Sequence, residues 1–195
     1  MTSGAKKQVI EAVVIGASAG GVQALLALLG DLPGSFRLPL IVVLHLPERR
    51  DSQLAEIFQY RLPIAVREAA DKESIAPATL YFAGPGYHLS VEMDRTFSLS
   101  CEEAVHYSRP SIDVLMASAA DCYGSALAGV VLTGANEDGA AGLARIKQQG
   151  GLTVVQDPAE AEVSTMPEAA IARLKPDVVL KLAGIRDLLF RLGSP

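Results

Sequence analysis

The sequence lacks several features that would assign it at once to a common class of protein. No apolar run approaches the roughly 20 residues that a membrane-spanning helix needs, and the first eight residues hold no apolar core typical of a signal peptide. The 17 basic residues are outnumbered by 22 acidic ones, and no basic stretch carries interleaved aromatic residues. These absences favour a cytoplasmic protein that neither inserts into a membrane nor binds nucleic acid.

Cysteine and histidine are also scarce. The two cysteines, Cys101 and Cys122, form no metal-binding or redox spacing, so we expect two reduced thiols. No three ligands stand at metal-binding spacing, and we expect neither a metal ion nor an organic cofactor. Only three histidines are present, which leaves few candidates for a catalytic base.

The composition is that of a folded domain. Half of the 195 residues are hydrophobic and a fifth are charged, which is enough to build one core of ordinary size. Neither an internal repeat nor a linker divides the chain. We expect a flexible tail over residues 1–8, followed by a single domain over residues 9–195.

Short apolar runs alternate with helix-forming runs along most of the chain. Strands are expected at 9–16, 39–44, 64–68, 127–132, 152–155 and 178–180. Helices are expected at 20–29, 52–60, 140–149, 167–174 and 185–192, with another that begins near Ser108 or Ser111 and ends near Tyr123. Three runs separated by turn residues, at 79–83, 88–92 and 96–100, predict an antiparallel meander. The pattern predicts an α/β fold: a doubly wound, mostly parallel sheet with helices on both faces and an antiparallel meander at one edge.

The chain is organised around a glycine-rich corner that joins the first expected strand to the first helix. Its sequence, Gly16-Ala17-Ser18-Ala19-Gly20, has the spacing Gly-x-Ser-x-Gly. This spacing places the serine on a sharp turn, where its hydroxyl projects beyond the strand end. The start of the following helix offers free backbone N–H groups, which favour negative charge.

Three interpretations of this corner remain open on the motif alone. It is a tight turn without chemistry, a cradle for a phosphate group or dinucleotide, or the site of a nucleophilic serine. The cradle is the weakest interpretation, because Gly16, Gly20 and Gly21 do not follow the Gly-x-Gly-x-x-Gly pattern. The nucleophile requires a histidine and a carboxylate from elsewhere in the chain.

Candidates for both partners stand where other expected strands end. His45 directly follows the strand at 39–44, and Asp138 lies in the loop after the strand at 127–132. Because ligands bind at the carboxyl ends of parallel strands, we expect Ser18, His45 and Asp138 to converge on one edge of the sheet. In this arrangement His45 is the base and Asp138 the acid that orients it.

Alternative roles compete with these assignments. His45 could be purely structural, and Asp138 could cap the helix that begins at residue 140. Glu137 is adjacent to Asp138 and competes with it as the acid. We expect His88 and His106 to have surface or local hydrogen-bonding roles, and His88 could also shape the mouth of the site.

The order Ser…His…Asp disfavours a standard α/β-hydrolase, in which the same corner is followed by Asp and then His. Instead the sequence resembles the catalytic domain of the chemotaxis protein-glutamate methylesterases, the CheB family. The resemblance covers almost the whole chain and rests on segments that occur in the family's order. They are residues 15–21, 44–45, 81–89, 109–115, 132–142, 156–158 and 166–170.

The resemblance implies a serine hydrolase with Ser18 as nucleophile, His45 as base and Asp138 as orienting acid. Such enzymes remove methyl groups from glutamyl methyl esters on chemotaxis receptors, releasing methanol, and deamidate certain glutamines. Backbone N–H groups at Ala19, Gly20 and the Ala135 loop are the candidates for an oxyanion hole. The implied partners are the cytoplasmic helices of methyl-accepting receptors and a separate receiver or regulatory domain.

The sequence departs from the family pattern in three respects. Ala19 stands where the family usually has threonine, so a hydroxyl beside the serine is lost. Ala135, Asn136 and Glu137 replace the Met-Gly centre of a family loop, which could reshape the oxyanion hole and adds a negative charge beside Asp138. The receiver domain that usually precedes the catalytic domain is not expected in this chain.

Two further interpretations follow from these departures. The altered loop is compatible with a CheB-like signalling or scaffold module that no longer catalyses. Alternatively, the chain is an esterase or amidase for another substrate.

Overall fold

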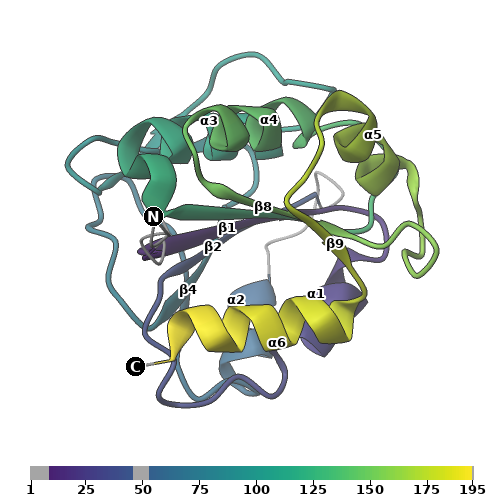
Figure 1. The fold of residues 1–195 in the computed structure, drawn as a ribbon. Helices are drawn as coiled ribbons and strands as arrows, with labels where there is room; N and C mark the ends of the chain where they lie inside the picture. The colour runs from purple at the N-terminus through teal and green to yellow at the C-terminus, as the bar shows by residue number, and fades with distance from the viewer. Residues whose placement is uncertain (1–8, 46–52, 195) are drawn as a thin grey trace, which may run out of the picture.

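The computed structural model describes residues 9–45 and 53–194 (Figure 1). The expected tail at residues 1–8 and the expected helix start at Ser52 lie outside this described part. The last strand residue before the undescribed segment 46–52 is Leu44, and His45 is itself described.

A parallel sheet forms the centre of the molecule. In the described ranges it has seven strands, in the order β3-β4-β2-β1-β7-β8-β9, and every neighbouring pair is parallel. The bounds are β1 (Ala12–Ala17), β2 (Leu40–Leu44), β3 (Ala65–Glu68), β4 (Thr79–Phe82), β7 (Leu127–Val131), β8 (Leu152–Gln156) and β9 (Val178–Leu180). Strands β1, β2 and β7 are buried at every residue, as expected of apolar runs in a sheet that is covered on both sides.

Helices cover both faces of this sheet, which confirms the doubly wound architecture. Below the sheet in Figure 1 lie α1 (Gly21–Leu29), α2 (Leu54–Gln59) and α6 (Leu182–Gly193). Above it lie α3 (Ile112–Tyr123), α4 (Ala140–Gln148) and α5 (Thr165–Arg173), and a short 3₁₀ helix, η1 (Gly124–Ala126), follows α3. Alternate residues of β1 enter two cores: Val13 and Ile15 pack below the sheet, and Ala12 and Val14 pack above it.

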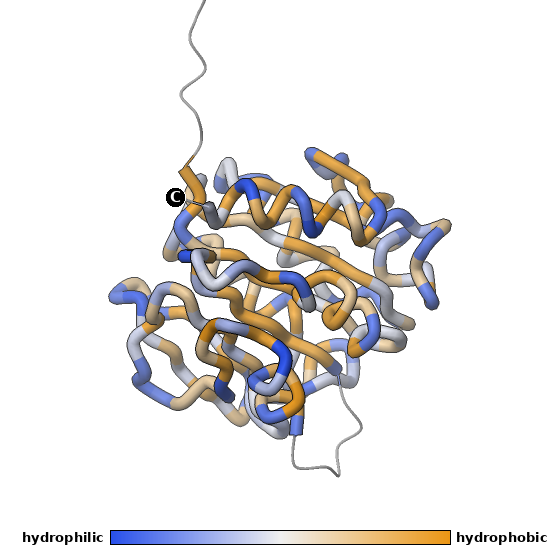
Figure 2. Tube along the Cα trace, turned by 90° about the horizontal axis from the view of Figure 1, so that it is seen from below, coloured by the Kyte–Doolittle hydropathy of each residue, from blue (hydrophilic) through white to orange (hydrophobic). Residues whose placement is uncertain are grey.

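The hydropathy of the chain follows these layers. In Figure 2 hydrophobic segments cross the middle of the molecule, whereas hydrophilic segments gather toward its periphery. None of the helices in the described ranges combines the length and the apolar character that a membrane crossing requires.

The antiparallel part of the fold has fewer strands than the expected three-stranded meander. Among the strands of the described residues, only β5 (His88–Val91) and β6 (Phe97–Ser100) pair antiparallel, and they form a separate two-stranded sheet. Strand β4, the first expected meander strand, instead lies between β2 and β3 in the parallel sheet. The physical reason is visible in its sequence: Leu80, Tyr81 and Phe82 are consecutive apolar residues, and all are buried, as in a strand covered on both faces.

Candidate active site

The candidate site lies where the winding of the sheet reverses. From β1 the chain first builds the strands on one side, β2, β3 and β4, and later those on the other, β7, β8 and β9. Ser18, His45 and the loop that carries Asp138 follow the carboxyl ends of β1, β2 and β7. Such a switch point is the usual place for a ligand in an open α/β sheet.

Backbone hydrogen bonds join the ends of these three strands. The His45 amide donates to the Ala17 carbonyl over 3.1 Å, and the Ser18 amide donates to the Thr133 carbonyl over 3.0 Å. The regular pairing of the sheet therefore continues into the site. It fixes the backbones from which the Ser18 and His45 side chains project.

Asp138 is the most firmly held residue of the site. Its side chain has no exposed surface, and four groups in the described residues donate to its carboxylate. His45 Nε2 (2.9 Å) and the Ile112 amide (2.7 Å) donate to Oδ2, while Ser111 Oγ (2.8 Å) and the Asp113 amide (2.9 Å) donate to Oδ1. The two amides belong to the first turn of α3, so the carboxylate lies at the positive end of that helix.

This environment keeps Asp138 ionised. Burial has the largest single effect and raises the pKa, but the hydrogen bond from His45 and those from Asp113, Ile112 and Ser111 together outweigh it. The net result is a pKa of Asp138 below its ordinary value.

An ionised carboxylate accepts hydrogen bonds and cannot donate them, so His45 Nε2 must carry the proton of this contact. The other ring nitrogen, Nδ1, is then the one that can accept a proton. The His45 side chain is 11% exposed, and its Nδ1 lies 3.5 Å from Ser108 Oγ. The geometry thus gives His45 one defined tautomer, as a general base requires.

The structure corrects the expectation that Asp138 could cap the following helix. The residue that precedes α4 is Gly139, and Asp138 instead binds the start of α3. The start of α4 is held by Asp113, whose Oδ1 accepts from the amides of Gly139 (2.9 Å) and Gly142 (2.6 Å). Asp138 and Asp113 therefore cap each other's helices. For the start of α3, Ser111 and not Ser108 is the capping residue.

Ser18 lies beside a glycine that allows a close approach. A Cβ on Gly134 would lie 3.0 Å from Ser18 Cβ and 2.5 Å from Met166 Cε, so the loop after β7 packs tightly against the serine. Ser18 is half-buried. Both Ser18 and His45 are described, and no hydrogen bond between them is formed in this arrangement.

Backbone N–H groups beside Ser18 are free to bind a negative charge. The amides of Ala19, Gly20 and Ala135 donate to no acceptor in the part of the chain that the structure describes. Gly20 directly precedes α1 and has a φ of 76°, which glycine adopts without strain. These three amides are the ones that the sequence analysis names as candidate oxyanion donors, and that role stays a prediction.

Thr133 supports the corner, and the sequence analysis did not single it out. Its buried hydroxyl donates to the Ala19 carbonyl over 2.8 Å and accepts from the Val163 amide over 2.9 Å. It therefore holds the residue after Ser18 even though Ala19 brings no hydroxyl of its own. A clue was available, since Thr133 lies in one of the segments that carry the family resemblance.

The other two histidines have local partners, as expected. His88 is buried; its Nδ1 accepts from the Ser111 amide over 3.1 Å, and its Nε2 lies 3.0 Å from the Glu103 carbonyl. His88 therefore supports the capping residue of α3. His106 lies between Asp113 Oδ2 (3.4 Å) and Glu137 Oε1 (3.5 Å).

Glu137, the expected competitor of Asp138, is 67% exposed and contacts His106 instead of His45. Potential ligand atoms of His106, Asp113 and Asp138 lie within 4.8 Å of one another. This set does not suit a metal ion, because N–H and O–H donors already point at the carboxylate oxygens of Asp138 and at Asp113 Oδ1.

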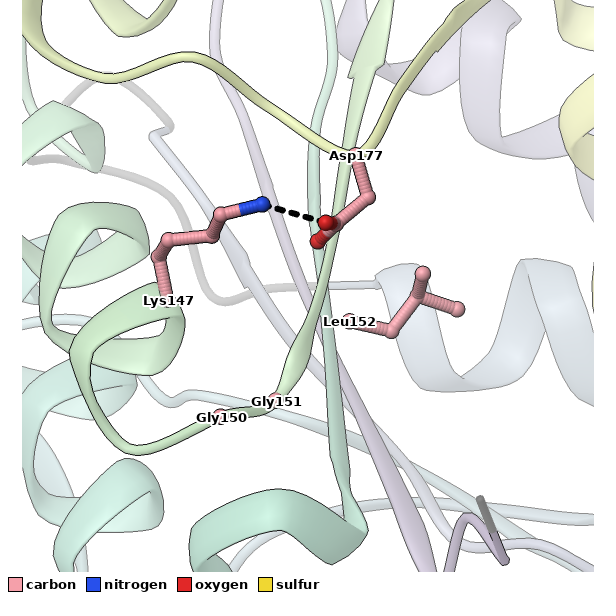
Figure 3. A pocket seen from close by; sticks show the side chains of 5 residues that line it. All are labelled: Lys147, Gly150, Gly151, Leu152 and Asp177. Carbon is pink, nitrogen blue, oxygen red and sulfur yellow. Dashed lines mark hydrogen bonds and ion pairs between the residues drawn. The ribbon is translucent and has the colours of Figure 1, made fainter. Parts of the chain in front are cut away.

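A cavity of about 280 Å³ lies at the opposite, amino edge of the sheet (Figure 3). Its lining residues are Lys147, Gly150, Gly151, Leu152 and Asp177. Asp177 accepts from Lys147 Nζ and from the amide (2.9 Å) and hydroxyl (2.7 Å) of Thr153. Burial raises the pKa of Asp177, but these hydrogen bonds outweigh that effect and leave the pKa below its ordinary value. Because its two charged groups pair with each other, this cavity is not a second candidate site.

Comparison with known proteins gives a consistent result. Residues 13–189 match the family described as CheB methylesterase. A Leptospira interrogans protein named putative protein-glutamate methylesterase/protein-glutamine glutaminase is 48% identical over 184 residues, which cover 94% of this chain and 95% of that protein. A Clostridium acetobutylicum protein-glutamate methylesterase/protein-glutamine glutaminase is 33% identical, and the match covers 94% of this chain but 53% of that longer protein.

The solved structures include a similar fold. The crystal structure of the Thermotoga maritima CheB methylesterase catalytic domain matches with a TM-score of 0.89 at 31% identity, covering 94% of this chain and 98% of that one. The fold, the order of the segments and these similarities agree: the chain belongs to the CheB methylesterase family.

Proposed function

We propose that the chain is a protein-glutamate methylesterase that removes methyl groups from glutamyl methyl esters of chemotaxis receptors and deamidates glutamines at such positions. Ser18 is the nucleophile, His45 the general base and Asp138 the residue that orients His45. The observation that carries this proposal is the 2.9 Å bond between His45 Nε2 and the buried, four-fold hydrogen-bonded Asp138, beside the Ser18 corner of a CheB-family fold.

The reaction proceeds in two halves. Ser18 Oγ attacks the ester carbonyl while His45 Nδ1 takes its proton, and the negative charge of Asp138 stabilises the imidazolium that forms. The tetrahedral intermediate then expels methoxide, which receives the proton from His45 and leaves as methanol. A water molecule attacks the resulting glutamyl-Ser18 ester with its proton going to His45. The bond to Ser18 Oγ then breaks, His45 returns the proton to that oxygen, and glutamate is released. With a glutamine substrate ammonia leaves in place of methanol.

The tetrahedral intermediate carries a negative oxygen that needs hydrogen-bond donors. The free amides of Ala19 and Gly20, at the positive end of α1, are the proposed donors, with Ala135 on the opposite loop. Each donor of this kind contributes roughly 3–4 kcal/mol to the stability of the transition state. Hydrogen bonds between a serine and its base often form only when substrate is bound, and we propose this for Ser18 and His45.

Two contacts favour a working enzyme over a silent module. Asn136, which belongs to the altered loop, accepts from the Asp138 amide through its Oδ1 over 3.2 Å. The loop therefore supports the acid that it carries. Thr133 holds the Ala19 carbonyl, so the missing threonine beside Ser18 is compensated from the loop after β7.

The proposal includes the surroundings of the enzyme. Residues 9–195 act as one catalytic domain in the cytoplasm, and the substrates are the cytoplasmic helices of methyl-accepting receptors. A separate receiver or regulatory domain is the further proposed partner. The match to the CheB methylesterase family supports the choice of substrate, and the parallel sheet that carries all three site residues supports a single catalytic domain.

The direct test is methanol release from receptor membranes whose glutamates carry labelled methyl esters. We expect the protein to release labelled methanol and Ser18→Ala to release none above background. Release by neither protein, together with fast acylation of Ser18 by a fluorophosphonate, would indicate an esterase for another substrate. Absence of both reactions in a folded protein would indicate the silent module.

A further inference from the structure

A tight turn at the rim of the site has an unusual backbone. Val105 and Ser108 exchange two backbone hydrogen bonds, of 3.1 and 2.8 Å, and enclose His106 and Tyr107. Both enclosed residues have positive φ, 48° and 60°. Asparagine and glycine usually occupy these positions of a two-residue turn, because larger side chains are strained there. Strain of this kind persists when surrounding contacts hold it, and it is concentrated at functional sites.

The turn is held against the catalytic residues from both sides. His106 lies between Asp113 and Glu137, at 3.4 and 3.5 Å, and Asp113 is one of the two residues whose amides donate to Asp138. On the other side, Ser108 Oγ lies 3.5 Å from His45 Nδ1. The residue between these two anchors, Tyr107, is therefore placed at the mouth of the site.

The Tyr107 ring lies outside the packed core. Tyr107 is 100% exposed, so folding gains no burial energy from an aromatic residue in a strained conformation. A second tyrosine, Tyr87, is 46% exposed on the neighbouring loop, which is joined to the same segment by a bond from the Gly86 amide to the Arg109 carbonyl. The mouth of the site thus presents exposed aromatic surface, which is typical of residues that dominate protein interfaces.

The chemistry of the proposed reaction indicates which molecule contacts this exposed aromatic surface. The inference rests on the proposed function: the ester lies at the end of a glutamyl side chain, only roughly 4–5 Å from its own backbone. For the ester carbon to reach the half-buried Ser18, the substrate polypeptide must lie directly across the rim. We propose that Tyr107 binds this polypeptide, packing its ring against the chain that carries the ester, and so contributes to recognition of the protein substrate and not to the chemical step.

The test separates protein substrate from a small probe. Methanol release is measured against receptor concentration, and the rate of Ser18 acylation by a fluorophosphonate is measured in parallel. We expect Tyr107→Ala to raise the KM for receptor about tenfold, with kcat and the acylation rate within twofold of the parent. Tyr107→Phe, which keeps the ring, should behave like the parent.

Tyr60 supplies the matched control, because it is 94% exposed in the connection that leads to the amino end of β3, away from the site. Tyr60→Ala should leave both readouts unchanged. An unchanged KM in Tyr107→Ala, or an equal loss in both readouts, would overturn the inference while the proposed function stands. No methanol release by the parent protein would overturn the proposed function itself.

Discussion

Each of the two edges of the sheet holds an aspartate whose pKa is below its ordinary value, but the two aspartates have different roles. At the amino edge, Asp177 pairs with Lys147 and the Thr153 hydroxyl. At the carboxyl edge, Asp138 is bound by the start of α3 and by His45. A protonated lysine cannot take up a further proton, whereas a neutral histidine can. The side chain that each carboxylate binds therefore distinguishes a structural aspartate from one that supports a general base.

The largest expected difference between the edges comes from replacing these two partners. His45→Gln removes the base, and we expect the acylation of Ser18 by a fluorophosphonate to fall by roughly 10⁵–10⁶-fold. Lys147→Gln breaks a partly exposed ion pair, which costs at most about 1 kcal/mol, and should leave the acylation rate within twofold. Stopped-flow labelling of both variants measures this, and similar rates in the two would contradict the assignment of roles.

A matched pair of threonines sharpens the comparison. Thr133 and Thr153 are both buried, and each hydroxyl joins two strands or loops. Replacing either with valine removes two partly buried hydrogen bonds, so each should lower the free energy of unfolding by about 1–3 kcal/mol. Only Thr133→Val should also slow acylation, about tenfold or more, because it loosens the backbone beside Ser18.

Urea titrations and labelling rates on the same samples test this pair. If Thr153→Val slowed acylation as much as Thr133→Val, the loss would reflect stability in general and not the position of Ser18.

The smallest expected effect is on stability in acid. The folded pKa values of Asp138 and Asp177 are lowered, so both contribute stability above their unfolded pKa of about 3.9, and that stability is lost as pH falls through the folded values. Asp177→Asn should therefore show a smaller loss of unfolding free energy between pH 5 and pH 2.5 than the parent. Urea unfolding at several pH values measures it, and parallel curves would show that Asp177 is not linked to folding.

The sequence predicted the strands that carry the site because their signals are local. Two apolar runs, which end just before Ser18 and His45, can be recognised from the sequence alone, and so can the polar loop after β7. Because all three follow parallel strands, they are expected at one edge of the sheet. The place of β4 was not predicted, because a short apolar strand next to a glycine-proline turn fits a hairpin and a parallel sheet equally well.

The hydrogen bonds that anchor Asp138 to the start of α3 could not be predicted from the sequence either. Apart from His45, its donors are two backbone amides and a serine some 25 residues away, and they meet it through the packing of α3 against the loop before α4. The local signal, an aspartate just before a helix, suggested a cap for α4 instead. Long-range pairing between helix ends leaves no periodic trace in the chain.

The most direct test of this account is the acylation rate of Ser18 in Asp138→Asn, with circular dichroism as the check that the variant is folded. If Asp138 fixes the tautomer of His45, the rate should fall by about 10⁴ while Asp177→Asn remains near the parent. A folded Asp138→Asn protein that acylates Ser18 at the parental rate would show that the carboxylate is structural and that His45 does not depend on it.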